Sequence, residues 1–476
     1  MIVERPPIPP EPVLVVGLGR AGDAAARALA ERLGPDAVYA SDDHDGPETR
    51  VVAAGLADLG VHVALGRRPP GWPRPAAVVK SPGIPAGAAC LPAGVATIDE
   101  LELGWRLSGE RVAAITGTNG KGTTAWLLGQ LLEGSGTPAV VCGNFELGVP
   151  FSAASVVPGG VFVVESSSYQ LETPGTMLPE VALLTNLGED HRDRHGTRET
   201  YAPIKRRLFV RGDRVVPAAV LCADDDFARE LAGELRERGA RVTTYGRAVD
   251  ADYRIRALRY DLTSAELTVA APGGELRLRT RLPGDHNALN AVGALAAATA
   301  LGVEPAAAAE ALADAAPVPG RFEPVDIGQP FTAVVDFAHN PDGYTAVLTA
   351  ARRLARGHVR VLIGVRGGMD PFKRPAMGEV AATLADQVFV TSGEDHVGES
   401  RERRIEQLLE GAMRGDAELV VEPERDRAIE RLVAAAEPGD VLLVLGRGAQ
   451  ASPLVEGERP FDDRDALRAA IRQSRE

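Results

Sequence analysis

The residues best suited to chemistry lie between Gly117 and Thr123, in the run Gly-Thr-Asn-Gly-Lys-Gly-Thr. Glycines let the backbone turn tightly with its N–H groups pointing into one small space, and Lys121 adds a positive charge for outer phosphates. The spacing is unusual, because only two residues separate Gly117 from Gly120, and Gly122 stands where a hydroxyl residue normally binds Mg²⁺. One of the two threonines that follow has to supply that hydroxyl. We interpret the run as a nucleoside triphosphate site; the alternative is a glycine-rich turn with a solvated lysine.

Polar side chains also follow other apolar runs that are typical of buried strands. Glu165 comes directly after the apolar run 160–164, and a carboxylate at a strand end near a phosphate loop is a natural Mg²⁺ ligand. The run 181–186 leads into a dense cluster of charge and imidazole at 188–195, for which the alternative is a solvated loop. Lys205, taken alone, looks like an ordinary surface lysine on a helix.

A second glycine motif lies near the start of the chain. The short apolar run 13–16 leads into Gly17-Leu18-Gly19-Arg20-Ala21-Gly22 and then a helical pattern, with Asp42 and Asp43 about 20 residues further on. The motif provides a diphosphate site at a helix N-terminus, whichever nucleotide carries the diphosphate. A dehydrogenase that uses nicotinamide is one alternative, and a tight strand-to-helix turn without a ligand is another.

The elements that have to position these residues alternate between strand and helix, so we predict an α/β protein with three domains. The expected domains are a Rossmann-like domain at 1–107, a phosphate-loop domain at 108–318 and a Rossmann-like domain at 319–476. Alternating residues over 253–281 predict a small antiparallel sheet within the central domain. The predicted strands of the third domain are 331–336, 359–364, 387–391 and 441–445.

Composition narrows the function classes. The chain has 476 residues, 45% of them hydrophobic, and a formal net charge of −14, which argues against a nucleic-acid partner. Its three cysteines are far apart, so neither a disulfide framework nor a cysteine zinc site is indicated. We expect no membrane segment, because no apolar run approaches the ~20 residues that span a bilayer, and the first residues lack a signal peptide. We therefore expect a cytoplasmic protein.

With these pieces in place, the chain resembles the Mur ligase family over nearly its whole length. The resemblance rests on motifs in the central segment: Gly117-Thr118-Asn119-Gly120-Lys121, Glu165-Ser166-Ser167-Ser168, Asn186 with Asp190-His191 and Asp193, and His286-Asn287 with Asn290. It implies an ATP-dependent ligase in which the γ-phosphate passes to a substrate carboxylate and the amine of an amino acid then attacks the acyl phosphate. Positioning and neutralisation of two anions would do most of the work.

The resemblance also implies roles for individual residues, with Lys121, His191 and Lys205 as the catalytic ones. Thr123 and Glu165 would hold one Mg²⁺ and His191 a second. Lys205 matches a lysine that is carbamylated in the family, which would make it an anionic oxygen ligand. The residues expected to bind ATP are Gly117, Thr118, Asn119, Gly120, Lys121, Gly122, Thr123, Asn287, Arg321 and Asp336. From the sequence alone, Asp285 or Asn287 can also be explained as a helix cap.

The first domain resembles that of the family members that add D-glutamate to UDP-N-acetylmuramoyl-L-alanine in peptidoglycan precursor synthesis. We therefore expect this nucleotide and an amino acid as partners of a monomer. The expected substrate-binding residues are Gly17, Leu18, Gly19, Asp42, Ser81, Pro82, Gly83, Asn144 and Ser167.

The third domain departs from that pattern. The stretches 336–341 and 460–464 look more like the ligases that add the third residue, or like folylpolyglutamate and cyanophycin synthetases, although 393–396 replaces the Asn-Pro-Arg motif that selects diaminopimelate. The alternative is therefore addition of L-glutamate or another amino acid. A dehydrogenase would leave Lys121 and Glu165 without a function, whereas an idle nucleotide-binding scaffold stays open because of Gly122.

Overall fold

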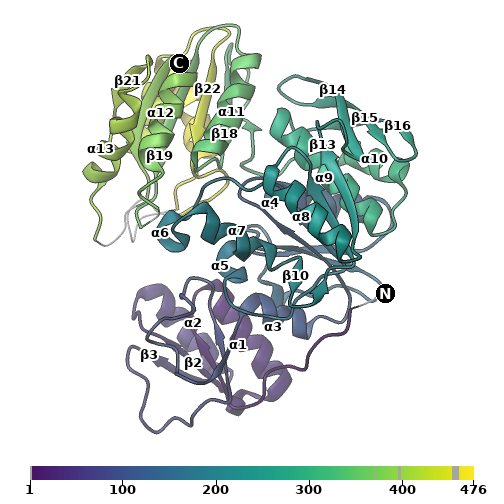
Figure 1. The fold of residues 1–476 in the computed structure, drawn as a ribbon. Helices are drawn as coiled ribbons and strands as arrows, with labels where there is room; N and C mark the ends of the chain where they lie inside the picture. The colour runs from purple at the N-terminus through teal and green to yellow at the C-terminus, as the bar shows by residue number, and fades with distance from the viewer. Residues whose placement is uncertain (1–2, 369, 395–397, 453–459, 476) are drawn as a thin grey trace. The chain divides into compact units, whose positions relative to one another are not determined.

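The computed structural model describes residues 3–368, 370–394, 398–452 and 460–475. Contacts divide the chain into two compact units: Met1–Leu187 with Glu199–Arg254 and Val292–Ala311, and Gly188–Arg198 with Ile255–Ala291 and Leu312–Glu476. Each expected domain segment contributes one large sheet (Figure 1). The boundaries at 107 and 318 stay a proposal.

The N-terminal sheet is parallel and has the order β3-β2-β1-β4-β5. Its strands are β1 (Val13–Val16), β2 (Val38–Asp42), β3 (His62–Leu65), β4 (Ala77–Lys80) and β5 (Ala96–Asp99). The connecting helices are α1 (Arg20–Leu33), η1 (Pro35–Ala37), α2 (Pro47–Asp58) and α3 (Glu100–Leu107). The order reverses at β1, so the loops after β1 and β4 lie side by side at the carboxyl edge, where such sheets bind ligands.

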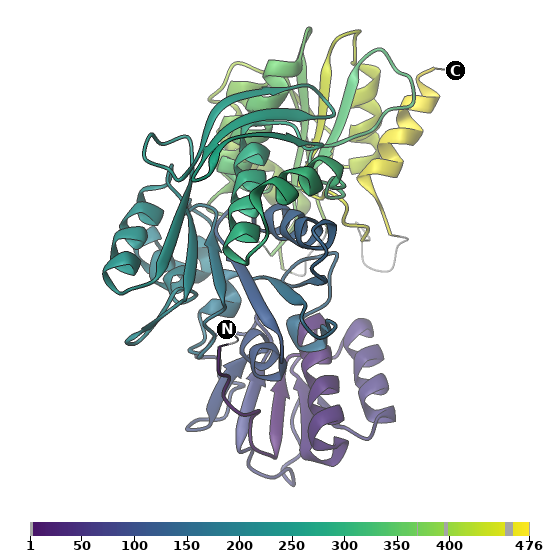
Figure 2. The same ribbon diagram turned by 90° about the vertical axis from the view of Figure 1, so that its right-hand side faces the viewer.

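The central sheet has the order β16-β15-β14-β13-β12-β9-β6-β8-β7. Its strands are β6 (Arg111–Thr116), β7 (Ala139–Gly143), β8 (Val161–Glu165), β9 (Val181–Leu184), β12 (Ala218–Cys222), β13 (Arg241–Gly246), β14 (Tyr253–Tyr260), β15 (Ala265–Ala271) and β16 (Gly274–Thr280). The last three are the predicted antiparallel strands, with β15 and β16 paired antiparallel (Figure 2). They continue the parallel sheet instead of forming a separate one, because β14 pairs with β13.

Helices and short elements connect or follow these strands along the chain. They are α4 (Lys121–Gly134), η2 (Phe151–Ala153), α5 (Ser168–Leu171), α6 (Arg192–His195), α7 (Arg198–Arg206), α8 (Asp226–Glu237), α9 (Asp285–Ala300), α10 (Pro305–Asp314) and the hairpin strands β10 (Val210–Arg211) and β11 (Arg214–Val215). The chain passes from the first unit into the second at Gly188 and returns at Glu199, so α6 belongs to the second unit.

The C-terminal sheet has the order β17-β18-β22-β19-β20-β21, and all of its strands except β17 are parallel. Its strands are β17 (Glu323–Pro324), β18 (Thr332–Asp336), β19 (Val359–Val365), β20 (Gln387–Ser392), β21 (Glu418–Val421) and β22 (Val441–Leu445). Its helices are α11 (Pro341–Leu354), α12 (Arg374–Leu384), α13 (Arg401–Ala412), α14 (Arg425–Ala434) and α15 (Asp463–Gln473).

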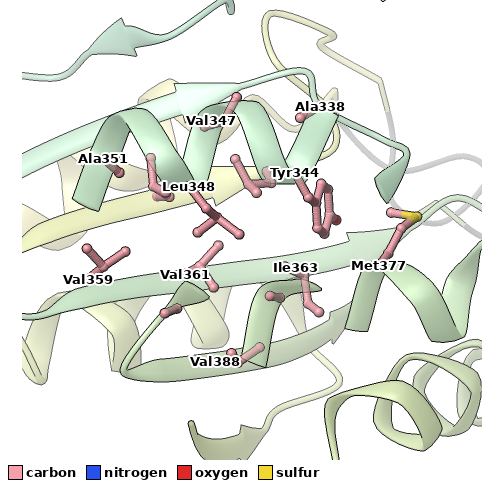
Figure 3. Close-up of a cluster of buried hydrophobic side chains, with 14 of the residues drawn as sticks. Ala338, Tyr344, Val347, Leu348, Ala351, Val359, Val361, Ile363, Met377 and Val388 are labelled. Carbon is pink, nitrogen blue, oxygen red and sulfur yellow. The ribbon is translucent and has the colours of Figure 1, made fainter. Parts of the chain in front are cut away.

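Two hydrophobic cores cover the two faces of this sheet, one beneath α11, α12 and α13 and the other beneath α14 and α15. Figure 3 shows the first core, where Leu348 of α11 points towards Val361 of β19. Neighbouring strand residues point to opposite faces, and Leu362 accordingly lies in the second core. The predicted α/β class with parallel sheets and added antiparallel strands is confirmed. None of the helices in the described part of the chain has the length and apolar character needed to cross a membrane.

Candidate nucleotide site

The loop between β6 and α4 has a backbone that only glycine adopts easily. Gly117 has φ +150° and Gly120 has φ +82°, both in the region that side chains disfavour. A Cβ on Gly117 would lie 1.8 Å from the hydroxyl oxygen of Thr185, so the loop passes directly over the end of β9. Helix α4 begins at Lys121, immediately after the turn. The N-terminus of α4 therefore faces the space that the loop encloses, as an anion site requires.

Two residues at the end of β9 fasten the loop. The backbone N–H groups of Thr118 and Asn119 donate to the carbonyl and side-chain oxygens of Asn186, each at 3.0 Å. The hydroxyl of Thr185 donates to the carbonyl oxygen of Asn119 at 2.6 Å. This part of the loop is therefore held in place before any ligand arrives, which lowers the entropic cost of binding.

The carboxylate of Glu165 lies against the start of α4. A Cβ on Gly122 would be 3.0 Å from Glu165 Oε2, so the carboxylate lies close to the backbone at position 122. Thr123, one residue further, is 4% exposed and offers a hydroxyl. The amide of Asn144 donates to Glu165 Oε1 at 3.3 Å. A hydroxyl and a carboxylate next to a phosphate cradle are hard oxygen donors that suit Mg²⁺, so these residues fit the ion.

Both lysines expected at this site contact the phosphate loop. Lys121 Nζ donates to the carbonyl oxygen of Thr118 at 2.9 Å. Lys205 Nζ donates to the carbonyl oxygen of Gly117 at 2.6 Å, and its side chain is 1% exposed and lies 4.6 Å from the Tyr201 ring. The surface-lysine interpretation of Lys205 is therefore wrong. The structure brings Lys121, Glu165 and Lys205 together at one loop.

The glycines of the motif in the first domain have different roles: two are required by the fold, and one leaves space next to a helix N-terminus. Gly17 has φ +90°, and a Cβ on Gly22 would lie 1.7 Å from the carbonyl oxygen of Gly17, so the fold itself requires both. A Cβ on Gly19 would meet nothing within 4 Å. Gly19 precedes α1 and leaves open the approach to the helix N-terminus, as expected for a diphosphate cradle. Asp42 shapes this loop, because its carboxylate accepts the N–H of Leu18 at 2.7 Å.

Ser81, followed by Pro82 and Gly83, begins the loop after β4. The N–H of Ser81 donates to the carbonyl oxygen of Val16 at 2.8 Å, at the end of the adjacent strand β1. A Cβ on Gly17 would lie 2.8 Å from Ser81 Cβ. The two loops that we expect to bind the substrate are therefore in direct contact.

Within the same unit, the glycine motif also contacts the loop after β7. Arg20 donates to the carbonyl oxygens of Phe145 and Glu146 at 3.3 and 3.2 Å, next to Asn144. Ser167 is the N-cap of α5, where its hydroxyl accepts a backbone N–H. The substrate role of Ser167 stays a prediction.

His191 belongs to the second unit, at the N-cap of α6, with φ +55°. The preceding Asp190 is 6% exposed and accepts hydrogen bonds from Lys373 Nζ at 2.8 Å and Asn340 Nδ2 at 3.1 Å. Burial alone would raise the pKa of Asp190, but the Lys373 ammonium and the imidazoles of His191 and His339 hold it below its usual value. The role of His191 as a magnesium ligand stays a prediction.

The other expected ATP contacts also lie in the second unit. Asn287 is 2% exposed and donates to the carbonyl oxygen of Pro283 at 2.8 Å. The guanidinium of Arg321 lies 4.1 Å from the centre of the Phe337 ring. Both carboxylate oxygens of Asp336 accept backbone N–H groups, at 2.6 and 2.7 Å. These residues shape the local backbone, and their contacts with ATP stay predictions.

Residue patterns alone missed several functional candidates. Thr185, Lys373 and Asn340 were assigned no role, because each acts through a contact with a residue distant in sequence. A usable signal was present for Lys373, since the chain contains only four lysines. Among the described residues, no group of three or more His, Cys, Asp or Glu side chains is arranged to hold a metal. The expected magnesium ligands include a hydroxyl and a carbamate, which lie outside that residue set.

Two family models match the chain. The Mur ligase middle domain matches residues 115–298, and the Mur ligase glutamate ligase domain matches residues 320–448. The first match includes the phosphate loop, Glu165 and Lys205, whereas the glycine motif at Gly17 lies outside both.

Two relatives of this chain have the same name, which gives their activity. The chain is 36% identical to the UDP-N-acetylmuramoyl-L-alanyl-D-glutamate–2,6-diaminopimelate ligase of Thermosynechococcus vestitus over 75% of this chain and 76% of that protein. It is 31% identical to the ligase of the same name from Synechococcus elongatus over 88% and 87%. These relatives do not support the expected D-glutamate addition and favour the alternative, a ligase of the type that adds the third residue.

Solved structures share the fold. MurF from Acinetobacter baumannii matches with a TM-score of 0.62 and 19% identity over 96% of this chain and 93% of that one. The UDP-N-acetylmuramate–alanine ligase MurC from Thermotoga maritima matches with a TM-score of 0.60 and 21% identity over 97% and 99%.

Proposed function

The chain belongs to the Mur ligase family and is an ATP-dependent acid–amino-acid ligase, and on that premise we propose that it extends a UDP-N-acetylmuramoyl peptide by one amino acid. The observation that carries the proposal is the phosphate-loop corner, where Lys121, Glu165 and Lys205 meet the glycine backbone. The proposal places this step in the synthesis of peptidoglycan precursors.

The chemistry needs two anions to approach each other. A carboxylate oxygen of the acceptor attacks the γ-phosphorus of ATP, ADP leaves, and the amine then displaces phosphate from the acyl phosphate to form the amide bond. The N-terminus of α4 and Lys121 favour the triphosphate in this position, because both carry positive charge towards it. Thr123 and Glu165 would hold a Mg²⁺, which neutralises phosphate charge when bound. His191 is assigned to a second Mg²⁺.

Lys205 is assigned as a carbamylated lysine. Its burial at 1% exposure and its contact with the Gly117 carbonyl oxygen support a role at the phosphate loop and argue against a surface role. The ammonium would lose a proton, the neutral amine would add CO₂, and a second proton would leave to give the carbamate. An anionic oxygen ligand for Mg²⁺ would then replace a buried cation. Asn287, Arg321 and Asp336 are assigned to the adenine, phosphate and ribose of ATP.

For the acceptor, we propose UDP-N-acetylmuramoyl-L-alanyl-D-glutamate, because the relatives at 31–36% identity carry this nucleotide in their names. Gly17, Leu18, Gly19, Asp42 and the Ser81 loop would bind its uridine diphosphate end. Asn144 and Ser167 are assigned to the sugar and peptide end.

A second candidate concerns the incoming amino acid. In the stretch 393–396, Glu394 pairs with Arg447 at 3.0 Å and with Arg366 at 2.9 Å, while Asp395 and His396 lie outside the described residues. A carboxylate held between two arginines differs from the Asn-Pro-Arg motif expected for diaminopimelate. This difference favours an incoming amino acid other than diaminopimelate. The second candidate is therefore addition of D-glutamate or L-glutamate to UDP-N-acetylmuramoyl-L-alanine.

The test is phosphate release with ATP and Mg²⁺ in a grid of two acceptors and four amino acids. The acceptors are the L-alanine and L-alanyl-D-glutamate nucleotides, and the amino acids are diaminopimelate, lysine, D-glutamate and L-glutamate. Release with the dipeptide nucleotide supports the lead proposal, and the amino acid in that row identifies the product. Release only with the L-alanine nucleotide favours the second candidate. No release with any combination contradicts both.

A further inference from the structure

Lysine is nearly absent from this chain. Among 52 lysines and arginines, only Lys80, Lys121, Lys205 and Lys373 are lysines. Arginine is therefore the usual cation of this chain, and each lysine places a compact ammonium where most positions have a planar guanidinium. Lys121 and Lys205 belong to the phosphate-loop corner. Lys373 has no role in the proposed function and is 7% exposed.

Lys373 lies at the N-cap of α12 and points towards the buried side chains of Asp190 and Asn340. Its Nζ donates to Asp190 Oδ1 at 2.8 Å, and Asn340, which is 0% exposed, donates to Asp190 Oδ2 at 3.1 Å. The imidazole of His339 lies 3.8 Å from the same carboxylate. Buried charges of this kind persist only where their partners are well placed.

Asp190 in turn controls the residue that follows it. Its Oδ1 accepts the backbone N–H of His191 at 2.9 Å, where His191 has the positive φ of +55°. A positive φ is unfavourable for a residue with a side chain, so the surrounding contacts have to hold it. The same oxygen accepts from Lys373 and from the His191 backbone, which links the ammonium directly to the conformation of His191.

A second hydrogen bond joins the segments 190–192 and 370–373, and here the carboxylate belongs to the second segment. The N–H of Arg192 donates to Asp370 Oδ2 at 2.8 Å, and the other oxygen of Asp370 accepts the N–H of Phe372 at 2.9 Å. Residues 190–192 and 370–373 are therefore joined by one carboxylate from each side. This arrangement fixes both the position and the direction of the chain at His191.

We infer that Lys373 is a positioning residue that acts through Asp190 to hold His191 for its magnesium ion. The inference rests on the proposed function, which assigns His191 to the metal. Lys373 does not have to touch the ion or the substrate for this role, because its ammonium is already engaged by the buried carboxylate. Partners that orient a metal ligand usually change metal affinity or activity by about 10- to 100-fold when removed.

The test measures metal binding directly, with the full chain and a non-hydrolysable ATP analogue. Mn²⁺ replaces Mg²⁺, and its affinity is read from electron paramagnetic resonance of the free ion. Lys373→Met should weaken Mn²⁺ binding about 10-fold or more, with a smaller loss for Asn340→Ala, which leaves the ion pair in place. The Mg²⁺ concentration for half-maximal phosphate release should rise in the same order.

Arg360→Met is the matched control. Arg360 Nε donates to Asp440 Oδ2 at 2.8 Å in the same unit, the two side chains are 11% and 1% exposed, and Arg360 lies near the amino end of β19. The control also breaks a largely buried ion pair, but it should leave Mn²⁺ affinity unchanged. Circular dichroism establishes that each variant is folded.

A folded Lys373→Met protein with wild-type Mn²⁺ affinity overturns the inference. An equal loss in Arg360→Met also overturns it, because the effect would then be a general consequence of destabilisation. An increase in the KM for the amino acid alone, with Mn²⁺ affinity intact, would instead place Lys373 at the substrate and overturn it as well. If Lys373→Met binds Mn²⁺ more weakly than the wild type as expected, but the wild type releases no phosphate with any acceptor, the proposed function fails and the positioning role stands.

Discussion

Each compact unit contains one buried lysine–aspartate pair. The two pairs consist of the same residue types, but the pKa values of their aspartates shift in opposite directions. Lys80 lies 3.2 Å from Asp99 in the first unit, and Lys373 lies 2.8 Å from Asp190 in the second, with all four residues at most 7% exposed. Burial raises the pKa of Asp99 to about 7, whereas the pKa of Asp190 is held below its usual value.

The neighbours of each carboxylate explain the difference. Asp99 is attracted by Lys80, but the buried acid Glu100 lies beside it, so desolvation prevails. Asp190 has the Lys373 ammonium beside it, and this attraction is the largest of those that lower its pKa and outweigh desolvation. Burial and Lys373 lower the pKa of the neighbouring His339 imidazole to about 3, so that ring is neutral between pH 5 and pH 8. A buried carboxylate in an ion pair therefore keeps its charge only where the attraction of its neighbours exceeds the cost of desolvation.

Each pair also lies one residue from a candidate ligand-binding residue. Lys80 is the last residue of β4, directly before Ser81, and is in register with Val16 at the end of β1. Asp190 directly precedes His191. We interpret the Lys80–Asp99 pair, which we call the Lys80 clasp, as an ion pair that holds the start of the Ser81 loop and whose aspartate titrates near neutral pH. The Lys373–Asp190 pair holds the chain before His191 and stays ionised.

The largest effect on stability should come from Lys80→Met. At pH 9 the change leaves Asp99 buried without its cation and should lower the free energy of unfolding by about 3 kcal/mol. At pH 5 the loss should be smaller, since Asp99 already carries a proton there. Urea denaturation at the two pH values measures both. An equal loss at pH 5 and pH 9 would contradict the titrating clasp.

Asp190→Asn should lower the free energy of unfolding by roughly 2 kcal/mol, because Lys373 then faces a neutral amide in a buried position. Since the pKa of Asp190 lies below its usual value, the carboxylate is ionised throughout the range from pH 5 to pH 8. The loss should therefore be the same at both ends of this range. Thermal and urea denaturation test the prediction, and a loss that disappears at pH 5 would mean that the two pairs behave alike.

The wild-type protein should lose stability as pH rises from 5 to 8. The folded-state pKa of Asp99, about 7, lies above its ordinary value of 3.8, so the folded state binds the extra proton in this range. Stability from that proton is complete below the unfolded pKa and is lost as pH rises through the folded one. Between pH 5 and pH 8 the free energy of unfolding should fall by about 3 kcal/mol. The slope should flatten in Asp99→Asn, and some slope should remain because burial also raises the pKa of Glu100.

Local sequence patterns predicted the central strands of the first and third domains. The strands at 13–16 and 441–445 match β1 and β22. Short-range periodicity and glycine spacing are enough for these features, because strand burial and tight turns depend on residues close in sequence.

The same patterns did not predict the buried pairs or the true environment of Lys205. Asp190 and Lys373 are 183 residues apart, and Lys205 contacts a carbonyl 88 residues away. No local period encodes such contacts. The position of Glu165 against Gly122 likewise emerges only when β8 and α4 pack together.

The smallest effect on stability should come from Gly19→Ala, in the loop next to the Lys80 clasp. Gly19 has φ −69°, and its added Cβ would meet nothing within 4 Å, so the free energy of unfolding should change by less than about 0.5 kcal/mol. The methyl group would, however, occupy the open approach to α1 and should weaken UDP binding by roughly tenfold, equivalent to ~1.4 kcal/mol. Calorimetric titration with UDP measures the binding.

Gly22→Ala is the contrasting variant, because its Cβ would lie 1.7 Å from the Gly17 carbonyl oxygen and the backbone would have to move. It should therefore lose stability as well as binding. If Gly19→Ala binds UDP as tightly as the wild type, the diphosphate does not lie over this helix N-terminus, and the Lys80–Asp99 clasp supports a turn of purely structural value.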